Sequence, residues 1–573
     1  MPDFINQKLL KDGPWQALER SIARLMQHGN FSDVRLVGRT GDEGADILGT
    51  LNGKRWVVQV KYHSRVSVGI DVVDEVMNAM KLYHADVPVL ATNTLFTDEV
   101  TKHKQKLLLS GINLQLWDKY TLQRQINILP DVSTKIKQPR EYQKNPINNI
   151  VDSVTGDNDK SGLVVMATGL GKTFVASEAV RRIKTDYPSK IDKVLVLAHT
   201  NELVYQLERS FWPTMKKNTS SAIWNGIEKG DIINSEYTFA CINSVIAWLE
   251  KYNELPADYK LIVIDEAHHS ASGYYKKLIE YTKAGTPEGP YLLGLTATPW
   301  RMDNQDINQI FENQLCSIDL IEGMGNGYLS NVDYRMHTDN INWDVLMATK
   351  DITPKALNKT LFIEEWNDAV IDVLQKTMSE INNPRVIVFC SNISHAHTVR
   401  DKINSRRFAK AAAIYSGVFN RNKMTPVDRS TTLCDFSDGR IQVICAVDIF
   451  NEGIDVPDVN ILVFQRVTHS RRIFVQQLGR GLRLSEGKDK VIVLDFVSDI
   501  RRFAAGIEMA TELDSSPVYL KLGSPVKFMN KSGDDPNTGK FLTAWLSDAA
   551  KIQDANDNDP VLKFPPLELL DKT

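Results

Sequence analysis

Short runs of apolar residues recur along most of this chain, and they constrain its fold more than any other feature. Four runs lie between residues 162 and 298 ("GLVVMAT", "VLVLAHT", "LIVIDEA" and "LLGLTAT"), and five lie after residue 384 ("RVIVFCS", "AAAIYSG", "IQVICAV", "NILVFQR" and "VIVLDFV"). Helical patterns separate the runs. Strands that are so uniformly apolar are usually buried on both faces of a parallel sheet. The pattern therefore predicts an α/β protein with two parallel-sheet lobes of similar size.

A glycine-containing loop follows the first of these strands. The segment "MATGLGKT", residues 166–173, stands between the apolar "GLVV" and the helical "FVASEAVRRI". In a strand–loop–helix setting, backbone N–H groups face phosphates, a lysine adds charge and a hydroxyl binds Mg²⁺. Met166 stands where the strict phosphate-loop pattern has glycine, and an accidental G-K-T turn is the alternative for this motif taken alone. The residues predicted to contact nucleotide here are Thr168, Gly169, Gly171, Lys172 and Thr173.

Two carboxylates end the third apolar run, in "LIVIDEAHHS". Asp265 and Glu266 stand where one carboxylate orients Mg²⁺ and another activates water. An acidic pair at a strand end is unremarkable by itself. Because a G-K-T loop lies upstream, the pair instead indicates phosphate chemistry.

At this point the chain resembles the superfamily 2 helicases and translocases, over residues 139 to about 500. The motifs occur in the family's order: "REYQ" with Gln143, "AHTNELVYQ", "DEAH", "TAT", "VDIFNEGIDVPDV" with Gly453 and Asp455, and "QQLGRGLR" with Arg480 and Arg483. Within the family, Met166 is an accepted variant of the loop's first position.

The resemblance implies an ATPase that moves on nucleic acid. ATP would be held by Lys172, Thr173 and Asp265 with Mg²⁺, while Gln143 reads adenine and Glu266 orients the attacking water. Arg480 and Arg483 would approach from the second lobe as arginine fingers, which are typically worth about 10³–10⁵ in rate. An arginine-rich surface helix is the alternative for these two residues. Because such a site closes only when the lobes meet, hydrolysis would open and close a nucleic-acid groove.

A hairpin near the N-terminus places polar residues inside a strand. Asn52-Gly53 in "ADILGTLNGKRWVVQVKY" is a strong signal for a two-residue turn, which sets Leu51 against Lys54. The same register sets Asp46 directly opposite Gln59, with Lys61 as the diagonal neighbour. A carboxylate, an amide and an ammonium group should therefore converge on one face, provided that no β-bulge intervenes.

This region resembles the PD-(D/E)xK nuclease fold, in its Mrr-like restriction endonuclease branch, across about residues 10–120. The resemblance implies that Asp46 and the main-chain carbonyl of Val60 bind Mg²⁺, and that Lys61 steadies the attacking water. Gln59 takes a position often held by an acid, and Glu19 matches the acidic residue on the first helix. A solvated strand with a surface lysine is the alternative.

The domains expected are a nuclease domain (1–125), a linker (126–139), an ATP-binding lobe (140–320), a connecting segment (321–370), a second lobe (371–509) and a C-terminal extension (510–573). The net charge of −3 over 573 residues excludes a chain that is basic throughout, so any DNA site must be local. From the sequence we expect neither a signal peptide nor a membrane span. Five scattered cysteines favour a reducing cytoplasm over disulfides or structural zinc.

The leading hypothesis is an ATP-dependent DNA endonuclease, in which a motor moves on DNA and a Mg²⁺ nuclease cuts it, in restriction or anti-phage defence. The alternatives are a DNA-stimulated helicase whose N-terminal domain only binds DNA, and a scaffold with degenerate copies of both folds. No D-P-P-Y methylase motif is present. Any protective methyltransferase would therefore be a separate subunit.

Overall fold

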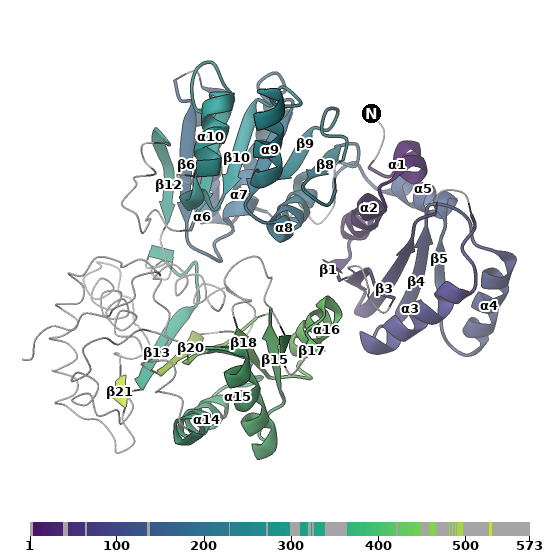
Figure 1. Ribbon diagram of the computed structural model, residues 1–573, viewed down its shortest axis with the longest axis vertical. Helices are drawn as coiled ribbons and strands as arrows, with labels where there is room; N and C mark the ends of the chain where they lie inside the picture. The colour runs from purple at the N-terminus through teal and green to yellow at the C-terminus, as the bar shows by residue number, and fades with distance from the viewer. Residues whose placement is uncertain are drawn as a thin grey trace, which may run out of the picture.

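Three large β-sheets and one two-stranded hairpin organise the described residues of the computed structural model of the chain (Figure 1). The structure describes residues 4–37, 44–63, 66–133, 138–156, 158–228, 230–270, 273–297, 307, 310–318, 322–323, 326–337, 364–416, 418–419, 422–447, 458–465, 481, 484, 488, 490–496 and 527–529. Within these residues no helix is both long and apolar enough to cross a bilayer.

The N-terminal domain is a five-stranded sheet, in the order β1-β2-β3-β4-β5, with helices on both faces. Its hairpin is antiparallel, whereas β3, β4 and β5 run parallel. The elements are α1 (Gln7–Asp12), α2 (Trp15–His28), β1 (Ser32–Leu36), β2 (Ile47–Leu51), β3 (Lys54–Lys61), α3 (Asp71–Leu82), β4 (Val87–Thr92), α4 (Asp98–Leu109), β5 (Gln115–Trp117) and α5 (Lys119–Ile128).

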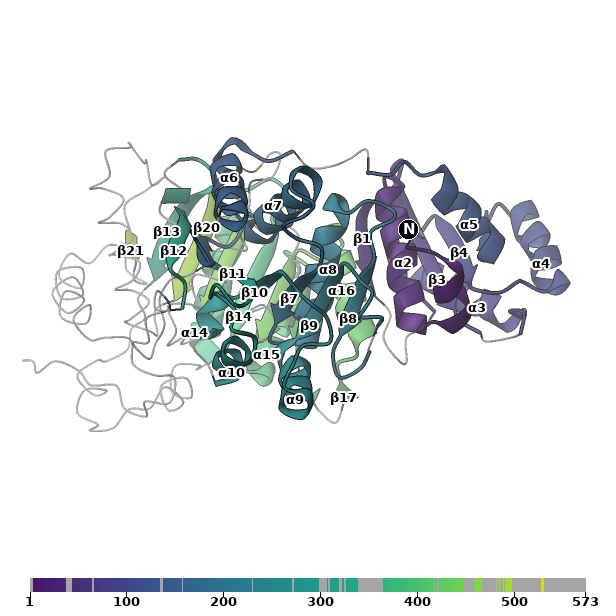
Figure 2. The ribbon, with the colours of Figure 1, turned by 90° about the horizontal axis from the view of Figure 1, so that it is seen from above.

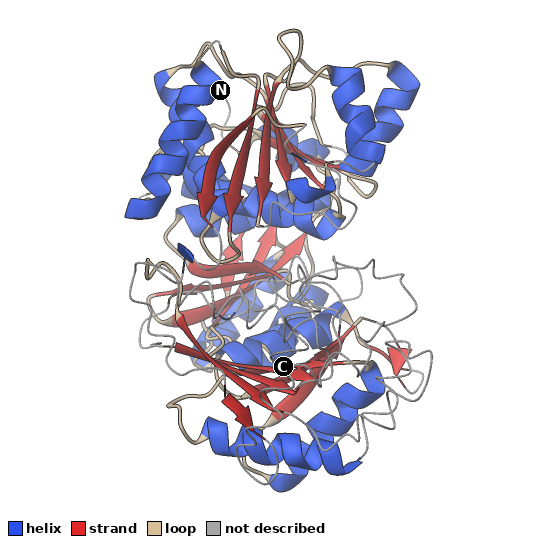
Figure 3. Ribbon diagram, turned by 90° about the vertical axis from the view of Figure 1, so that its left-hand side faces the viewer, coloured by secondary structure: helices blue, strands red, loops and turns tan. Residues whose placement is uncertain are grey.

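The first lobe is a seven-stranded parallel sheet in the order β12-β6-β11-β10-β7-β9-β8, which confirms the predicted parallel-sheet fold. The apolar strands are buried, with helices packed on both faces (Figure 3). The elements are α6 (Glu141–Thr155), β6 (Ser161–Met166), α7 (Lys172–Asp186), β7 (Val194–Ala198), α8 (Asn201–Phe211), β8 (Ser221–Trp224), β9 (Tyr237–Cys241), α9 (Ile242–Tyr252), β10 (Leu261–Asp265), α10 (Gly273–Thr282), β11 (Tyr291–Thr296) and β12 (Asn313–Ile318), with short 3-10 turns at Trp212–Thr214 and Ala267–His269.

The second lobe is also a seven-stranded parallel sheet, in the order β15-β18-β14-β19-β20-β13-β21. Two of its strands come from segments that the sequence assigned to no lobe: β13 from the connecting segment and β21 from the C-terminal extension. The elements are β13 (Asn331–His337), α14 (Glu364–Met378), β14 (Val386–Cys390), α15 (Ile393–Arg406), β15 (Ala411–Tyr415), the small hairpin β16 (Val418–Phe419) and β17 (Asn422–Lys423), α16 (Pro426–Ser437), β18 (Val443–Val447), β19 (Ile461–Gln465), β20 (Lys490–Phe496) and β21 (Lys527–Met529).

The N-terminal domain packs against the first lobe through helix α2. Arg20 on α2 donates to Glu208 Oε2 at 2.7 Å and to both carboxylate oxygens of Glu228, at 2.5 and 2.8 Å. Arg24, one turn further, donates to the backbone carbonyls of Lys216 and Thr219. Burial disfavours the charged form of Arg20, but the two glutamates outweigh this effect and raise its pKa. The helix is therefore buried on two sides, one apolar and one charged.

The same domain also contacts the second lobe. Arg55 of β3 donates from Nη1 to Asp438 Oδ2, 2.6 Å away, just beyond the end of α16. Cys434 of α16 is buried in one apolar cluster with Val57 and with α3 residues. In Figures 1 and 2 the N-terminal domain accordingly lies at one side of the molecule, beside α8 of the first lobe and α16 of the second.

Candidate functional sites

The phosphate loop lies between the end of β6 and the start of α7. Gly169 and Gly171 have φ of 98° and 85°, a backbone region that favours glycine. Gly171 is the N-cap of α7, so Lys172 and Thr173 begin the helix, whose first N–H groups have no partner within the helix itself. Together with the ends of β10 and α6, the loop surrounds a pocket of about 720 Å³.

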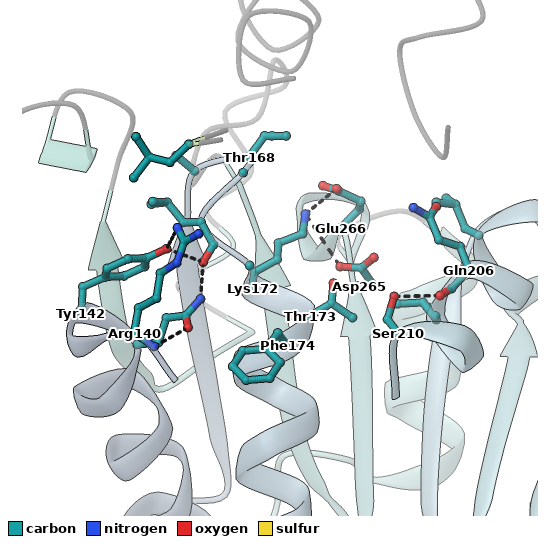
Figure 4. A pocket seen from close by; sticks show the side chains of 18 of the residues that line it. Arg140, Tyr142, Thr168, Lys172, Thr173, Phe174, Gln206, Ser210, Asp265 and Glu266 are labelled. Atoms are coloured by element: carbon teal, nitrogen blue, oxygen red, sulfur yellow. Dashed lines mark hydrogen bonds and ion pairs between the residues drawn. The ribbon is translucent and has the colours of Figure 1, made fainter. Parts of the chain in front are cut away.

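Charged side chains converge in this pocket (Figure 4). Lys172 Nζ forms a hydrogen-bonded ion pair with Glu266 and lies 3.7 Å from Asp265 Oδ1. Burial and the charge of Glu266 raise the pKa of Asp265, against the opposing effect of Lys172. Burial would also raise the pKa of Glu266, but Lys172 and His268 outweigh it and lower that pKa. Glu266 is therefore held as a carboxylate at the strand end.

The oxygen atoms and the lysine of this pocket fit a nucleotide bound with Mg²⁺. In the described part of the chain, Asp265 Oδ1 is buried without a hydrogen-bond partner, and hard oxygen ligands are those that Mg²⁺ prefers. Asp265 and Thr173 line the same pocket, so they would hold the cation. Lys172 would exchange Glu266 for phosphate when nucleotide binds, which would leave Glu266 available to water. Asp458 and Leu484 of the second lobe also line this pocket.

Gln143 is tied to the phosphate loop as well as lining the pocket. Its Nε2 donates to the carbonyl of Leu170 at 2.8 Å, and its Oε1 accepts the Arg140 N–H at 3.0 Å. Tyr142 Oη donates to the same carbonyl at 3.2 Å. Whatever Gln143 binds is therefore linked directly to the conformation of the loop.

His268, in the 3-10 turn after β10, contacts residues of two helicase-type motifs. His268 Nδ1 lies 3.2 Å from Glu266 Oε2 and 3.3 Å from the Thr296 hydroxyl at the end of β11. Thr296 opens the "TAT" segment. A shift of the Glu266 side chain can thus affect Thr296 on β11 through His268.

The hairpin of the N-terminal domain has the expected register between Leu51/Lys54 and Ile47/Val58. Asn52 and Gly53 both have positive φ, 51° and 73°, as a type I′ turn requires. The expected direct opposition of Asp46 and Gln59 is not found. The Asp46 N–H donates to the Val58 carbonyl at 2.9 Å, so Asp46 and Ile47 both stand against Val58, in the manner of a β-bulge.

The carboxylate of Asp46 is nonetheless beside β3, because its Oδ2 accepts the Val60 N–H at 2.5 Å. In an antiparallel pair, the N–H and C=O of one residue point to the same neighbour, so the Val60 carbonyl also faces Asp46. Gln59 Nε2 lies 3.5 Å from that carbonyl. Within the described residues Gln59 Oε1 is buried and has no hydrogen-bond partner. Hard divalent cations prefer oxygen ligands, so the Asp46 carboxylate and the Val60 carbonyl would hold such a cation here, with the Gln59 amide beside them.

Lys61 has a partner that was not predicted. Its Nζ donates to Glu75 Oε2 of α3 at 2.6 Å. The apolar residues of α3 pack with Val57, on the face that Gln59 and Lys61 share. Helix α2, which carries the half-buried Glu19, packs with Val58 and Val60 on the opposite face. The acid that the structure places against Lys61 is therefore Glu75.

The second-lobe site predictions fall outside the described residues. These residues are Gly453, Asp455, Arg480 and Arg483. The other predicted site residues divide into two groups, one at the phosphate loop and one at the hairpin, with Glu19 across the sheet from the latter. Glu75 was not predicted, because residues 70–80 carry apolar side chains at helical spacing, and that spacing indicates the buried face of a helix but gives no role to an acid beside it.

Family comparisons agree with this division into parts. Residues 10–126 match a "Restriction endonuclease" family of the Mrr type, residues 136–301 match "Type III restriction enzyme, res subunit", and residues 368–485 match "Helicase conserved C-terminal domain". The chain thus joins an N-terminal Mrr-type restriction endonuclease domain to a superfamily 2 helicase core. Both are enzyme domains. Helicases of this kind use ATP, and nucleases of this kind typically use a divalent metal.

Individual relatives resemble the helicase part. "Putative ATP-dependent helicase IRC3" of Saccharomyces cerevisiae is 26% identical over 368 residues, 62% of this chain and 51% of that protein. "DNA 3'-5' translocase XPB2" of Sulfurisphaera tokodaii is 24% identical over 424 residues, 66% of this chain and 87% of that protein. The chain therefore spans only about half of the yeast relative.

One solved structure matches nearly the whole chain. "ATP-dependent Type ISP restriction-modification enzyme LlaBIII bound to DNA" superposes with a TM-score of 0.53 at 15% identity, covering 94% of this chain and 42% of that one. At this identity the match shows the fold.

Proposed function

We propose that this chain is an ATP-dependent DNA endonuclease, in which a helicase-type translocase is coupled to a Mg²⁺-dependent nuclease. One observation carries the proposal: a nucleotide-type pocket and a hairpin with Asp46, Gln59 and Lys61 occur in one chain, and the hairpin domain packs on both lobes of the motor. Lobe movement driven by ATP hydrolysis would therefore reach the domain that carries the hairpin residues.

We assign the ATPase roles as follows. Lys172 and the loop glycines bind phosphate, Thr173 and Asp265 hold Mg²⁺, Glu266 orients water, and Gln143 contacts adenine. Gly453, Asp455, Arg480 and Arg483 would complete the site from the second lobe. At the nuclease site, Asp46 and the Val60 carbonyl would bind Mg²⁺ while Lys61 stabilises charge that develops on phosphate.

The biological setting that we propose is restriction or anti-phage defence in the cytoplasm. The restriction-type family matches at residues 10–126 and 136–301 support this setting, and the five free cysteines suit a reducing compartment. Duplex DNA is the proposed track and substrate, with single-stranded DNA as the alternative. A methyltransferase or another defence subunit would act with it.

The test is cleavage of linear and circular duplex DNA with ATP and Mg²⁺. Lys61→Ala should abolish cleavage but retain DNA-stimulated ATP hydrolysis, because the two sites are separate. Lys54→Ala is the matched control, since this exposed lysine lies at the other end of β3. Equal cleavage by wild type and Lys61→Ala would show that the nuclease assignment is wrong.

A second candidate is a DNA-stimulated helicase in DNA repair whose N-terminal domain only binds DNA. The curated relatives named as helicases and a translocase favour it, because their similarity covers about two thirds of this chain. It predicts ATP hydrolysis that rises with DNA and no cleavage with Mg²⁺ or Mn²⁺.

A further inference from the structure

We call Asp46, Gln59, the Val60 carbonyl and Lys61 the hairpin site. Asp46 is the one carboxylate in this set, and Glu75 lies where it could supply a second. Gln59 is 4% exposed and neutral, so it cannot offset the charge of a divalent cation as an acid would. Its Oε1 is an orphaned acceptor among the described atoms. Buried polar atoms are rarely left unpaired, so this atom indicates a ligand that binds there.

Glu75 is held beside the segment that carries Asp46. Gly44 has φ of +89°, and a Cβ added to it would lie 2.4 Å from the Glu75 carbonyl oxygen. The backbone of α3 and the backbone two residues before Asp46 are therefore in direct contact. The Glu75 side chain also reaches Lys61, which shares a strand face with Gln59. Its position thus depends on both parts of the hairpin site.

We propose that Glu75 belongs to the nuclease centre, as the carboxylate that replaces the missing acid at position 59 in binding the divalent cation. This inference rests on the proposed nuclease function. In the structure the Glu75 carboxylate pairs with Lys61. When the cation binds, Glu75 would turn to it, directly or through water, and Lys61 would be released toward phosphate.

The test is calorimetric titration of Mn²⁺ into the full-length, nucleotide-free protein, with DNA cleavage measured in parallel. Asp46→Asn identifies the binding event that belongs to the nuclease site. Glu75→Gln should weaken that event at least about tenfold, whereas Asp74→Asn, an exposed acid next to it on α3, should not change it. DNA-stimulated ATP hydrolysis should be the same in all variants, which shows that they fold.

The decisive variant combines Glu75→Gln with Gln59→Glu. It returns one carboxylate to the site, so Mn²⁺ affinity and cleavage should recover. If Glu75→Gln binds Mn²⁺ as wild type does, or if Gln59→Glu fails to restore binding, Glu75 is not a ligand and acts only on Lys61. Should Glu75→Gln not fold, Glu75→Asp replaces it and should keep measurable Mn²⁺ binding that Gln59→Glu strengthens.

The failure of the broader proposal has a different signature. If the wild-type protein shows neither Asp46-dependent Mn²⁺ binding nor cleavage, the nuclease function itself is wrong. If wild type shows both and only the Glu75 variants behave like wild type, the nuclease stands and this inference falls.

Discussion

Arg55 and Asp438 join the nuclease-type domain to the second helicase lobe, with Arg55 Nη1 2.6 Å from Asp438 Oδ2. Arg55 lies on β3, the strand that also carries Gln59 and Lys61. Helix α2 of the same domain is fixed to the first lobe by Arg20. The domain thus spans both lobes, and any movement of one lobe against the other must alter at least one of these contacts.

Removing the Arg55–Asp438 contact should release the second lobe from the N-terminal domain. Asp438→Ala is expected to raise ATP hydrolysis in the absence of DNA, because lobe closure no longer has to break this ion pair. Steady-state hydrolysis with and without duplex DNA measures the effect. Arg406→Ala, which removes exposed ion pairs inside the second lobe, is the control. An unchanged basal rate in Asp438→Ala would contradict the prediction.

Removing Arg20 should destabilise the domain interface. Arg20→Ala leaves the side chains of Glu208 and Glu228, 4% and 1% exposed, without their cation. Breaking a buried ion pair from one side costs about 3–5 kcal/mol. Urea unfolding followed by limited proteolysis should show earlier release of the N-terminal domain. Lys8→Ala, at the exposed Lys8–Asp231 pair of the same interface, should leave the transition where it is.

Glu266→Gln should separate nucleotide binding from hydrolysis. The amide keeps the shape of the side chain but cannot activate water, so the turnover rate should fall by about 10²–10⁴. ATP affinity should be retained or increased, because Lys172 loses the anion with which it forms an ion pair. Fluorescent-nucleotide binding and phosphate release measure the two properties. Full turnover in Glu266→Gln would remove its assigned role.

The second lobe should lose stability in mild acid because of His395. Burial lowers the pKa of this histidine to about 4, from 6.5. Between these values the unfolded chain binds a proton that the folded lobe excludes. The free energy of unfolding should therefore fall as the pH drops from about 6.5 to 4, by about 3 kcal/mol, and this contribution should not change further below pH 4.

His395→Gln isolates this contribution, because the amide does not titrate. The difference in unfolding free energy between wild type and variant should change by that amount across the pH range. Denaturant unfolding at pH 7, 5.5 and 4 gives the difference. A constant offset between the two proteins would show that His395 is not the group responsible.

The features that could be predicted from the sequence are those set by neighbouring residues. Asn52-Gly53 set the turn because both residues tolerate positive φ, and the apolar strands of the lobes predicted parallel sheets because nothing else buries both faces. The phosphate loop and the acidic pair were found from their spacing, and both line one pocket.

Other features depend on contacts between distant segments, which no local pattern contains. Trp15 belongs to the apolar stripe of α2 yet is 42% exposed, while Arg20 and Arg24 are buried. Their partners lie about 190 to 210 residues further along the chain, on the first lobe. The pairing of Lys61 with Glu75 likewise forms only when α3 packs on the sheet.

The central claim is that ATP use at Lys172 drives strand cleavage at Lys61, and one reaction series tests it directly. Circular duplex DNA is incubated with ATP and Mg²⁺, and phosphate release and cleavage are followed together in wild type, Lys172→Ala and Lys61→Ala. We expect wild type to show both activities, Lys172→Ala to lose both, and Lys61→Ala to lose cleavage alone. Cleavage that persists in Lys172→Ala at the wild-type rate would contradict the coupling.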